Sequence, residues 1–218
     1  MTLSNEKISE SAERLHRLFN EIEHYTPFYR NIESFSGSGL VITFETGQKS
    51  FGYDRIVHVG ESGNLSRRIR EFFMSIERNA TLKRHVGAAL INQANEDSVF
   101  AELWWENSHG IFDENYRAIE EKYMAKVFEY IKANMTFTIV PFPATIAEKR
   151  SELKDKILYT LGKYNEKNAF NNWLGNASPR NDVRTYGLWA EKFIKSEQIL
   201  TQDDFVLLEN LLENSGKL

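Results

Sequence analysis

The sequence predicts an α+β fold, in which a small three-stranded antiparallel sheet is flanked by helices. Two β-rich runs, residues 40–44 and 56–59, enclose a segment with two glycines, which is the pattern of an antiparallel hairpin. A third β-rich run, residues 135–142, follows a long segment of helical periodicity. We therefore expect residues 40–44, 56–59 and 135–140 to form one sheet, with helical elaborations toward both ends of the chain.

Apolar residues recur at three- and four-residue spacing in the remaining segments, which predicts amphipathic helices. Thr201 and Asp204 have the spacing of a capping pair at the start of the last helix. The predicted organisation is an N-terminal helical extension (1–35), a central domain (36–195) with a helical insertion at about 80–133, and a C-terminal helix (196–218). The predicted helices span residues 8–24, 65–78, 82–94, 115–133, 146–164 and 202–213.

Composition excludes several classes of protein. The chain has 41% hydrophobic residues, enough for a sizeable core, and no cysteine, so disulfides, thiolate zinc sites and cysteine nucleophiles are excluded. Residues 1–20 are polar and unlike a signal peptide, and no run approaches the roughly 18 apolar residues that span a bilayer. We expect a cytoplasmic protein with no membrane partner.

Charge is unevenly distributed along the chain. The net charge of −4 gives no overall signature of nucleic-acid binding. Residues 66–85 are nevertheless basic, and this segment could bind a phosphate backbone or could be a solvated face. Its cations, set against Glu71 and Glu77, are Arg67, Arg68, Arg70, Arg78, Lys83 and Arg84.

Familiar motifs for metals and nucleotides are missing from the sequence. The five histidines show no His-x-His or His-Glu-x-x-His spacing, and no glycine-rich phosphate loop precedes a helix, so we expect no nucleotide cofactor. What remains is the hairpin and the helix after it. Gly60 stands where strand gives way to helix, and Arg68 lies beside the apolar stripe of that helix, where its charge must reach water or a partner.

The run HVGESGNLSRRIR, from His58 to Arg70, resembles the second half of the GIY-YIG signature and its following helix. Residues 44–48, 84–90, 173–175 and 187–189 match a bacterial branch of that nuclease superfamily in order and spacing, so the resemblance covers roughly residues 36–195. The resemblance implies a three-stranded antiparallel sheet flanked by helices. It also implies hydrolysis of DNA phosphodiesters with a divalent metal, Mg²⁺ or Mn²⁺.

Family members use a tyrosine as general base, an arginine on the scissile phosphate and a metal-binding glutamate on a later helix. Gly60 and Arg68 match this pattern, whereas Val41 and His58 stand at the two signature tyrosines. The signature residues are thus degenerate. Further departures are Phe72 at the helix histidine and Lys154 at the metal-binding glutamate.

The resemblance therefore gives Arg68, His58 and Gly60 as catalytic candidates, with Arg68 on the phosphate. His58 could replace the tyrosine as base, since its ordinary pKa near 6.5 suits that role, or it could be an outward strand residue. Tyr53 could supply the missing phenol or be a surface residue. Glu152 is the candidate metal ligand, although it and Asp155 point about 200° and 100° away from Lys154 on a helix.

Arg67, Arg70, Lys83 and Arg84 are the predicted DNA contacts. Trp104 and Trp105 could stack on bases, although tryptophans in a mixed apolar run more often pack in a core. Three functions stay open. The first is a GIY-YIG DNA endonuclease, in restriction or defence; the second is a catalytically degenerate domain that binds nucleic acid; the third is a protein-interaction module, which the acidic net charge favours. A homo-oligomer is compatible with each.

Overall fold

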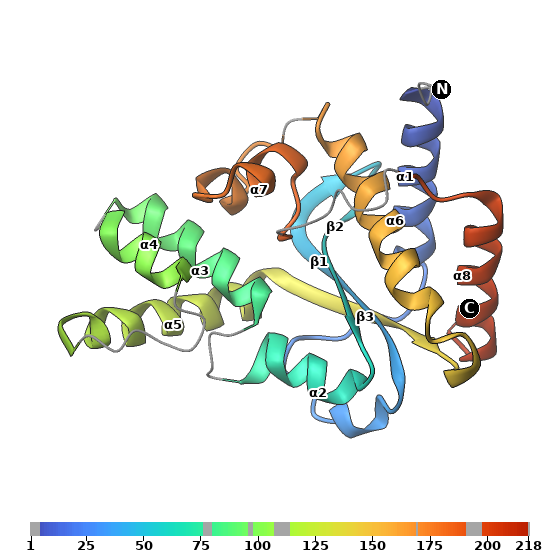
Figure 1. Cartoon of the computed structure of the whole chain (residues 1–218), viewed down its shortest axis with the longest axis horizontal. Helices are drawn as coiled ribbons and strands as arrows, with labels where there is room; N and C mark the ends of the chain where they lie inside the picture. The colour runs from blue at the N-terminus through green and yellow to red at the C-terminus, as the bar shows by residue number, and fades with distance from the viewer. Residues whose placement is uncertain are drawn as a thin grey trace.

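The computed structural model contains a three-stranded sheet at its centre (Figure 1). The strands are β1 (Ser38–Ser50), β2 (Tyr53–Ser62) and β3 (Met135–Phe142), in the order β2–β1–β3, and both pairings are antiparallel. The predicted fold class is therefore confirmed. The structure describes residues 5–75, 80–95, 98–106, 114–168, 170–190 and 198–217.

The hairpin is longer than the sequence indicated. The segment 47–54, expected as a turn, is mostly strand, because a register shift between Glu45 and Lys49 accommodates the extra residues. The chain reverses at Phe51 and Gly52, both with positive φ (54° and 84°), as a two-residue hairpin turn that matches the strand twist requires. The ring of Phe51 stacks on Tyr164 with centroids 4.7 Å apart, which anchors this unusual residue.

Helices cover both faces of the sheet. Alternate residues of β1 point to opposite faces, so Leu40 and Ile42 join one apolar cluster while Val41 joins the other. The Leu40 face packs against α1 (Asn5–Asn20), α6 (Lys149–Asn165) and α8 (Gln202–Asn214), which lie together in Figure 1. The Val41 face packs against α2 (Leu65–Ile69) with its π-helical continuation (Arg70–Met74), α3 (Thr81–Ala94), α4 (Ser98–Glu106) and α5 (Glu114–Asn134).

Most predicted helices are present with shifted ends. The first ends at Asn20, four residues before the expected residue 24, and the helix expected at 65–78 is described as far as Met74. Residues 76–79 lie outside the described part of the chain. The capping pair of Thr201 and Asp204 is confirmed as a reciprocal capping box. Sequence periodicity missed the short helices α4 and α7 (Asn181–Tyr186).

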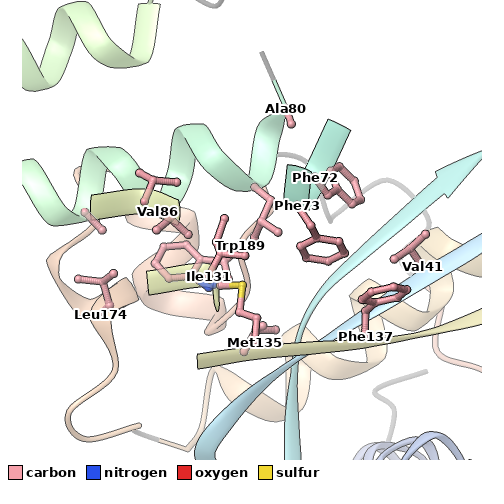
Figure 2. Packing of buried hydrophobic residues seen from close by; sticks show 14 of the residues in the cluster. Val41, Phe72, Phe73, Ala80, Val86, Ile131, Met135, Phe137, Leu174 and Trp189 are labelled. Carbon is pink, nitrogen blue, oxygen red and sulfur yellow. The ribbon is translucent and has the colours of Figure 1, made fainter. Parts of the chain in front are cut away.

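Aromatic residues fill the core on the Val41 face (Figure 2). Phe73, in the turn after α2, stacks on Phe137 of β3 with centroids 4.9 Å apart. Trp104 is fully buried, which confirms the core assignment, and a Cβ at Gly87 would lie 2.2 Å from its ring. No helix in the described ranges is both long and apolar enough to cross a bilayer.

A carboxylate lies within this core. Glu45 of β1 is 3% exposed and accepts hydrogen bonds from the indole Nε1 of Trp173 (2.8 Å) and of Trp189 (3.2 Å). The hydroxyl of Tyr130 on α5 donates a third. The carboxylate therefore joins three separate segments of the chain to the central strand.

Arg55, the cross-strand partner of Glu45, is wholly buried as well. Its Nη1 donates to the carbonyl oxygen of Gly187 at 2.5 Å, and its guanidinium lies 4.0 Å from the centroid of the Phe170 ring. Burial lowers the pKa of Arg55 to about 10, against the opposing effect of the Glu45 charge. Arg55 remains a cation at neutral pH and gives Glu45 a buried counter-charge.

Candidate nucleic-acid site

The strand pairing aligns the residues that carry the family signature. Val41 of β1 lies opposite Gly60 of β2, and Thr43 lies opposite His58. At the start of β1, a Cβ on Gly39 would lie 2.4 Å from the carbonyl oxygen of Val140, so only glycine allows β3 to approach this closely. The site is therefore built on a tightly packed end of the sheet.

Gly60 makes room for the ring of Phe72. A Cβ at Gly60 would lie 2.5 Å from Phe72 Cε2, and the rings of His58 and Phe72 meet edge to face with centroids 4.9 Å apart. The sequence placed Phe72 at the family's helix histidine, and here it packs on the strand as a 3% exposed core residue. Gly60 thus has a packing role, and its predicted catalytic role stays a prediction.

Arg68 lies at the border between this packing and solvent. Its side chain is 31% exposed, with Cζ 5.3 Å from the centroid of the Phe72 ring and Nη1 3.0 Å from Glu71 Oε2. Arg68 Nε is buried and has no hydrogen-bond partner among the described residues. Arg67 Nε is 3.5 Å from the other carboxylate oxygen of Glu71. A phosphate could therefore take the place of Glu71 at Arg68, and Glu71 would stay paired with Arg67.

His58 lies deep in the site. It is 5% exposed, and its buried Nδ1 has no hydrogen-bond partner in the part of the chain that the structure describes. Burial, followed by the positive charges of Arg68 and Lys154, lowers the His58 pKa to about 3. This pKa lies far below the ordinary value near 6.5, because the side chain is buried and the neighbouring charges are cationic.

Glu61, which the sequence analysis missed, holds the cations of α6 at the same end of β2. Its carboxylate accepts from Lys154 Nζ at 2.7 Å and Ser151 Oγ at 3.2 Å, and Arg150 Nε lies 3.5 Å away. Burial raises the pKa of Glu61, but the opposing contributions are larger in sum and hold that pKa below its usual value. They come from hydrogen bonds with Lys154 and Ser151 and from the charges of Lys154 and Arg150. The sequence feature that could have identified Glu61 is its position directly after Gly60.

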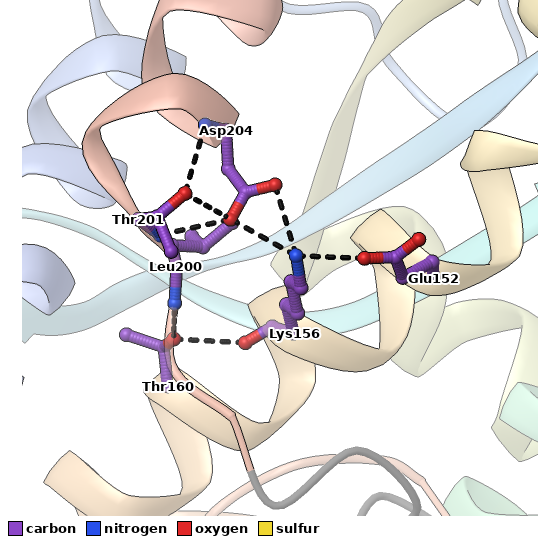
Figure 3. A network of polar contacts seen from close by, with 6 residues as sticks. All are labelled: Glu152, Lys156, Thr160, Leu200, Thr201 and Asp204. Carbon is purple, nitrogen blue, oxygen red and sulfur yellow. Dashed lines mark hydrogen bonds and ion pairs between the residues drawn. The ribbon is translucent and has the colours of Figure 1, made fainter.

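Glu152 lies elsewhere on α6, in a network that joins α6 to α8 (Figure 3). Its carboxylate is 2.7 Å from Lys156 Nζ, which also contacts both carboxylate oxygens of Asp204 at 3.1 and 3.2 Å. In the described ranges, no three His, Cys, Asp or Glu side chains converge as a metal site. With Lys154 bound to Glu61, the residues at this end of β2 do not fit a divalent ion.

The four predicted DNA contacts differ in accessibility. Arg67 is 68% exposed, and Arg70 forms an ion pair with Glu33. The prediction for Lys83 is corrected, because this residue is fully buried and its ammonium donates to the carbonyl of Ser75. Arg84 is partly buried against Trp105, to whose carbonyl it donates a hydrogen bond. These residues do not form one continuous basic face.

A β2–β1–β3 antiparallel sheet flanked by helices is consistent with a GIY-YIG class of domain. The chain belongs to the GIY-YIG domain family, whose sequence profile matches residues 6–216. This is a nuclease family, so a nucleic-acid substrate and a divalent metal are typical of its members. No curated protein and no solved structure matches the chain.

His85 provides a test of the site's electrostatics. It is fully buried between Trp105 and Trp189, and neither ring nitrogen has a hydrogen-bond partner within the described ranges. Burial, followed by the nearby His58, lowers the pKa of His85 to about 3. Between pH 6.5 and pH 3, His85 is protonated in the unfolded chain and neutral in the folded protein. The free energy of unfolding therefore falls as the pH falls toward 3.

His85→Phe should therefore make the acid side of the stability profile shallower, by up to about 1.4 kcal/mol per pH unit. At pH 7.5 the variant should be at least as stable as the wild type, because it removes unsatisfied polar atoms. Urea unfolding from pH 7.5 to pH 4 measures both effects. An unchanged slope would contradict the buried, neutral state of His85.

Proposed function

We propose that this chain binds DNA phosphodiesters at Arg68 without hydrolysing them through a divalent metal. The observation that carries the proposal is the 2.7 Å ion pair between Lys154 and Glu61. By the resemblance, Lys154 stands where family members have the metal-binding glutamate. The Lys154 ammonium repels a divalent cation. It also occupies the Glu61 carboxylate, which could otherwise serve as a metal ligand in place of the missing glutamate.

The state of His58 supports the same proposal. A general base works best with a pKa near the operating pH and must reach the proton that it removes. His58 has a pKa of about 3 and is 5% exposed, so at neutral pH it binds a proton only weakly. The site consequently combines a weak base with a poor set of metal ligands.

The site can bind a phosphate even without an effective base and a set of metal ligands. Arg68 and Lys154 both lower the pKa of His58, so both positive charges are within electrostatic reach of that side chain. Arg68 is accessible, and its planar guanidinium can donate to two phosphate oxygens at once. A phosphodiester bound here would gain charge-assisted hydrogen bonds without a metal.

DNA endonuclease activity is the second candidate function. It is supported by membership of a nuclease family and by the matching Gly60 and Arg68. Incision of supercoiled plasmid by the wild type with Mg²⁺ or Mn²⁺, lost with chelator and in Arg68→Ala, would establish it. Incision by both proteins alike would instead indicate contamination.

Arg68→Ala should weaken DNA binding about tenfold or more, since hydrogen bonds to charged groups contribute about 1.5–3 kcal/mol. Wild-type affinity should also fall steeply as salt rises. Fluorescence anisotropy with labelled duplex DNA at low and moderate salt measures both effects. The control is Arg117→Ala, which removes an exposed arginine of α5 paired only with Glu121 at 3.9 Å in the described part of the chain. Absence of binding at low salt would favour the protein-interaction alternative.

A further inference from the structure

A pocket of about 420 Å³ lies between the end of α6 and the segment that leads into α7. Asn165, the last residue of α6, ties the two together, because its amide Nδ2 donates to the carbonyl oxygen of Tyr186 at 2.8 Å. Figure 1 shows α7 beside this end of α6. Lys154, in the candidate nucleic-acid site, is about 16 Å away along the helix axis. The pocket is therefore separate from that site.

The pocket presents hydrogen-bond acceptors that are held in place. Asn168 and Asn176 line it together with Asn165. The amide Nδ2 of Asn168 donates to the carbonyl oxygen of Tyr164, and that of Asn176 donates to Phe170, both at 2.7 Å. Since a carbonyl only accepts, these contacts assign the nitrogen and the oxygen of each amide. No donor in the described part of the chain reaches any of the three amide oxygens, and Asn165 Oδ1 is buried, so the lining matches a ligand that supplies donors.

An aromatic ring and two cations complete the lining. Phe170 contributes the ring, which is partly buried. Lys167 and Arg184 are exposed, and their nitrogen atoms contact only amide and carbonyl oxygens in the described ranges. Glu166, a carboxylate of the lining, is already paired with Lys163 at 3.0 Å. The pocket therefore keeps positive charge that an anionic group can use.

We propose that this pocket binds a nucleotide whose base carries an exocyclic amino group. The amino group donates to the asparagine oxygens, the flat base packs against Phe170, and the phosphate lies toward Lys167 and Arg184. The volume is within the range of about 300–1,000 Å³ for small-molecule pockets. The ligand is a free mononucleotide or a nucleotide of a DNA strand, which share this chemistry. The inference goes beyond the proposed function and does not depend on DNA binding at Arg68.

The test compares deoxycytidine monophosphate with thymidine monophosphate by isothermal titration calorimetry on the full chain. Cytosine presents an amino donor where thymine presents an acceptor oxygen. The wild type should bind deoxycytidine monophosphate at least about tenfold more tightly, because thymine would leave the facing amide oxygen unpaired. Equal affinities, or no binding of either nucleotide, would overturn the proposal.

Two variants locate the binding. Asn176→Ala removes one acceptor of the lining and should weaken binding of deoxycytidine monophosphate several-fold. Its matched control is Asn214→Ala, which changes an exposed asparagine of α8 and should have no effect. Lys167→Ala should weaken binding of the monophosphate and leave that of deoxycytidine unchanged. Thermal unfolding should show that all three keep the wild-type fold. Equal affinities of Asn176→Ala and Asn214→Ala would overturn the site.

A single-stranded oligodeoxycytidine distinguishes the two sources of the ligand. If it displaces the mononucleotide from the Arg68→Ala variant, the ligand is a nucleotide of a DNA strand; if it does not, the ligand is the free nucleotide. Because this variant lacks the proposed phosphate contact, the competition reports on the pocket alone. Failure of DNA binding at Arg68 would overturn the proposed function and leave this site intact, and failure of nucleotide binding would do the reverse.

Discussion

Glu45→Ala should lower the free energy of unfolding by about 3–5 kcal/mol, because it leaves a buried cation and three buried hydrogen-bond donors uncompensated. The substitution leaves the cation of Arg55 without its counter-charge. It also removes the acceptor shared by Tyr130, Trp173 and Trp189, whose donors stay in the core. The melting temperature should fall by about 10 °C.

Two further variants isolate the cause of this loss. Glu45→Gln keeps an acceptor oxygen and removes only the charge, so it should be destabilised less than Glu45→Ala. Glu209→Ala removes a carboxylate at the surface, 2.7 Å from Arg14, and should cost less than about 1 kcal/mol. Chemical unfolding with tryptophan fluorescence, supported by circular dichroism, ranks the three. Equal losses for Glu45→Ala and Glu209→Ala would show that the buried network adds no stability.

Lys154→Glu should create a divalent-metal site beside Glu61. The new carboxylate would face Glu61, and two adjacent carboxylates repel each other until a cation binds between them. At 100 times its dissociation constant, Mn²⁺ would stabilise the folded variant by about 2.7 kcal/mol. For a chain of this size, that corresponds to a rise in melting temperature of about 5–10 °C.

The control is Lys154→Gln, which removes the ammonium without adding a ligand and should not respond to Mn²⁺. The double variant with Glu61→Gln should also lose the response. Thermal melts with Mn²⁺, with Mg²⁺ and with chelator distinguish these cases. A comparable Mn²⁺ shift in the wild type would mean that the protein already holds a metal, and the proposed loss of the metal centre would then be wrong.

Local patterns in the sequence predicted the sheet and most helices, because strand alternation, helical periodicity and the Thr201–Asp204 cap each depend on neighbouring residues. The hairpin turn lies within the predicted segment 47–54, but that segment is longer than the turn for a physical reason. Gly47 and Gly52 both have positive φ, but only Gly52 is in the reversal, since Gly47 falls within the register shift of β1. Glycine alone does not distinguish a bulge from a turn.

The site was harder to predict, because it depends on which charges the fold buries. The sequence placed Lys83 at the surface, yet it is buried because neighbouring elements enclose α3. The small residues Gly87, Ala88 and Ala89 were the sequence feature that indicated this close packing. The pKa of His58 likewise depends on Lys154, which is 96 residues away in sequence. The role of Arg68 stays a prediction that the binding experiment decides.

The strand order also determines how the chain can fold. β1 and β2 are joined by a two-residue turn and can pair early, whereas Ser38 of β1 meets Phe142 of β3 across 104 residues. We therefore expect β1 to pair first with β2 alone and to pair with β3 only after the helices between β2 and β3 have brought β3 alongside it. Because the entropy of loop closure grows only slowly with loop length, insertions or deletions in that segment should alter the refolding rate modestly and leave the paired hairpin intact.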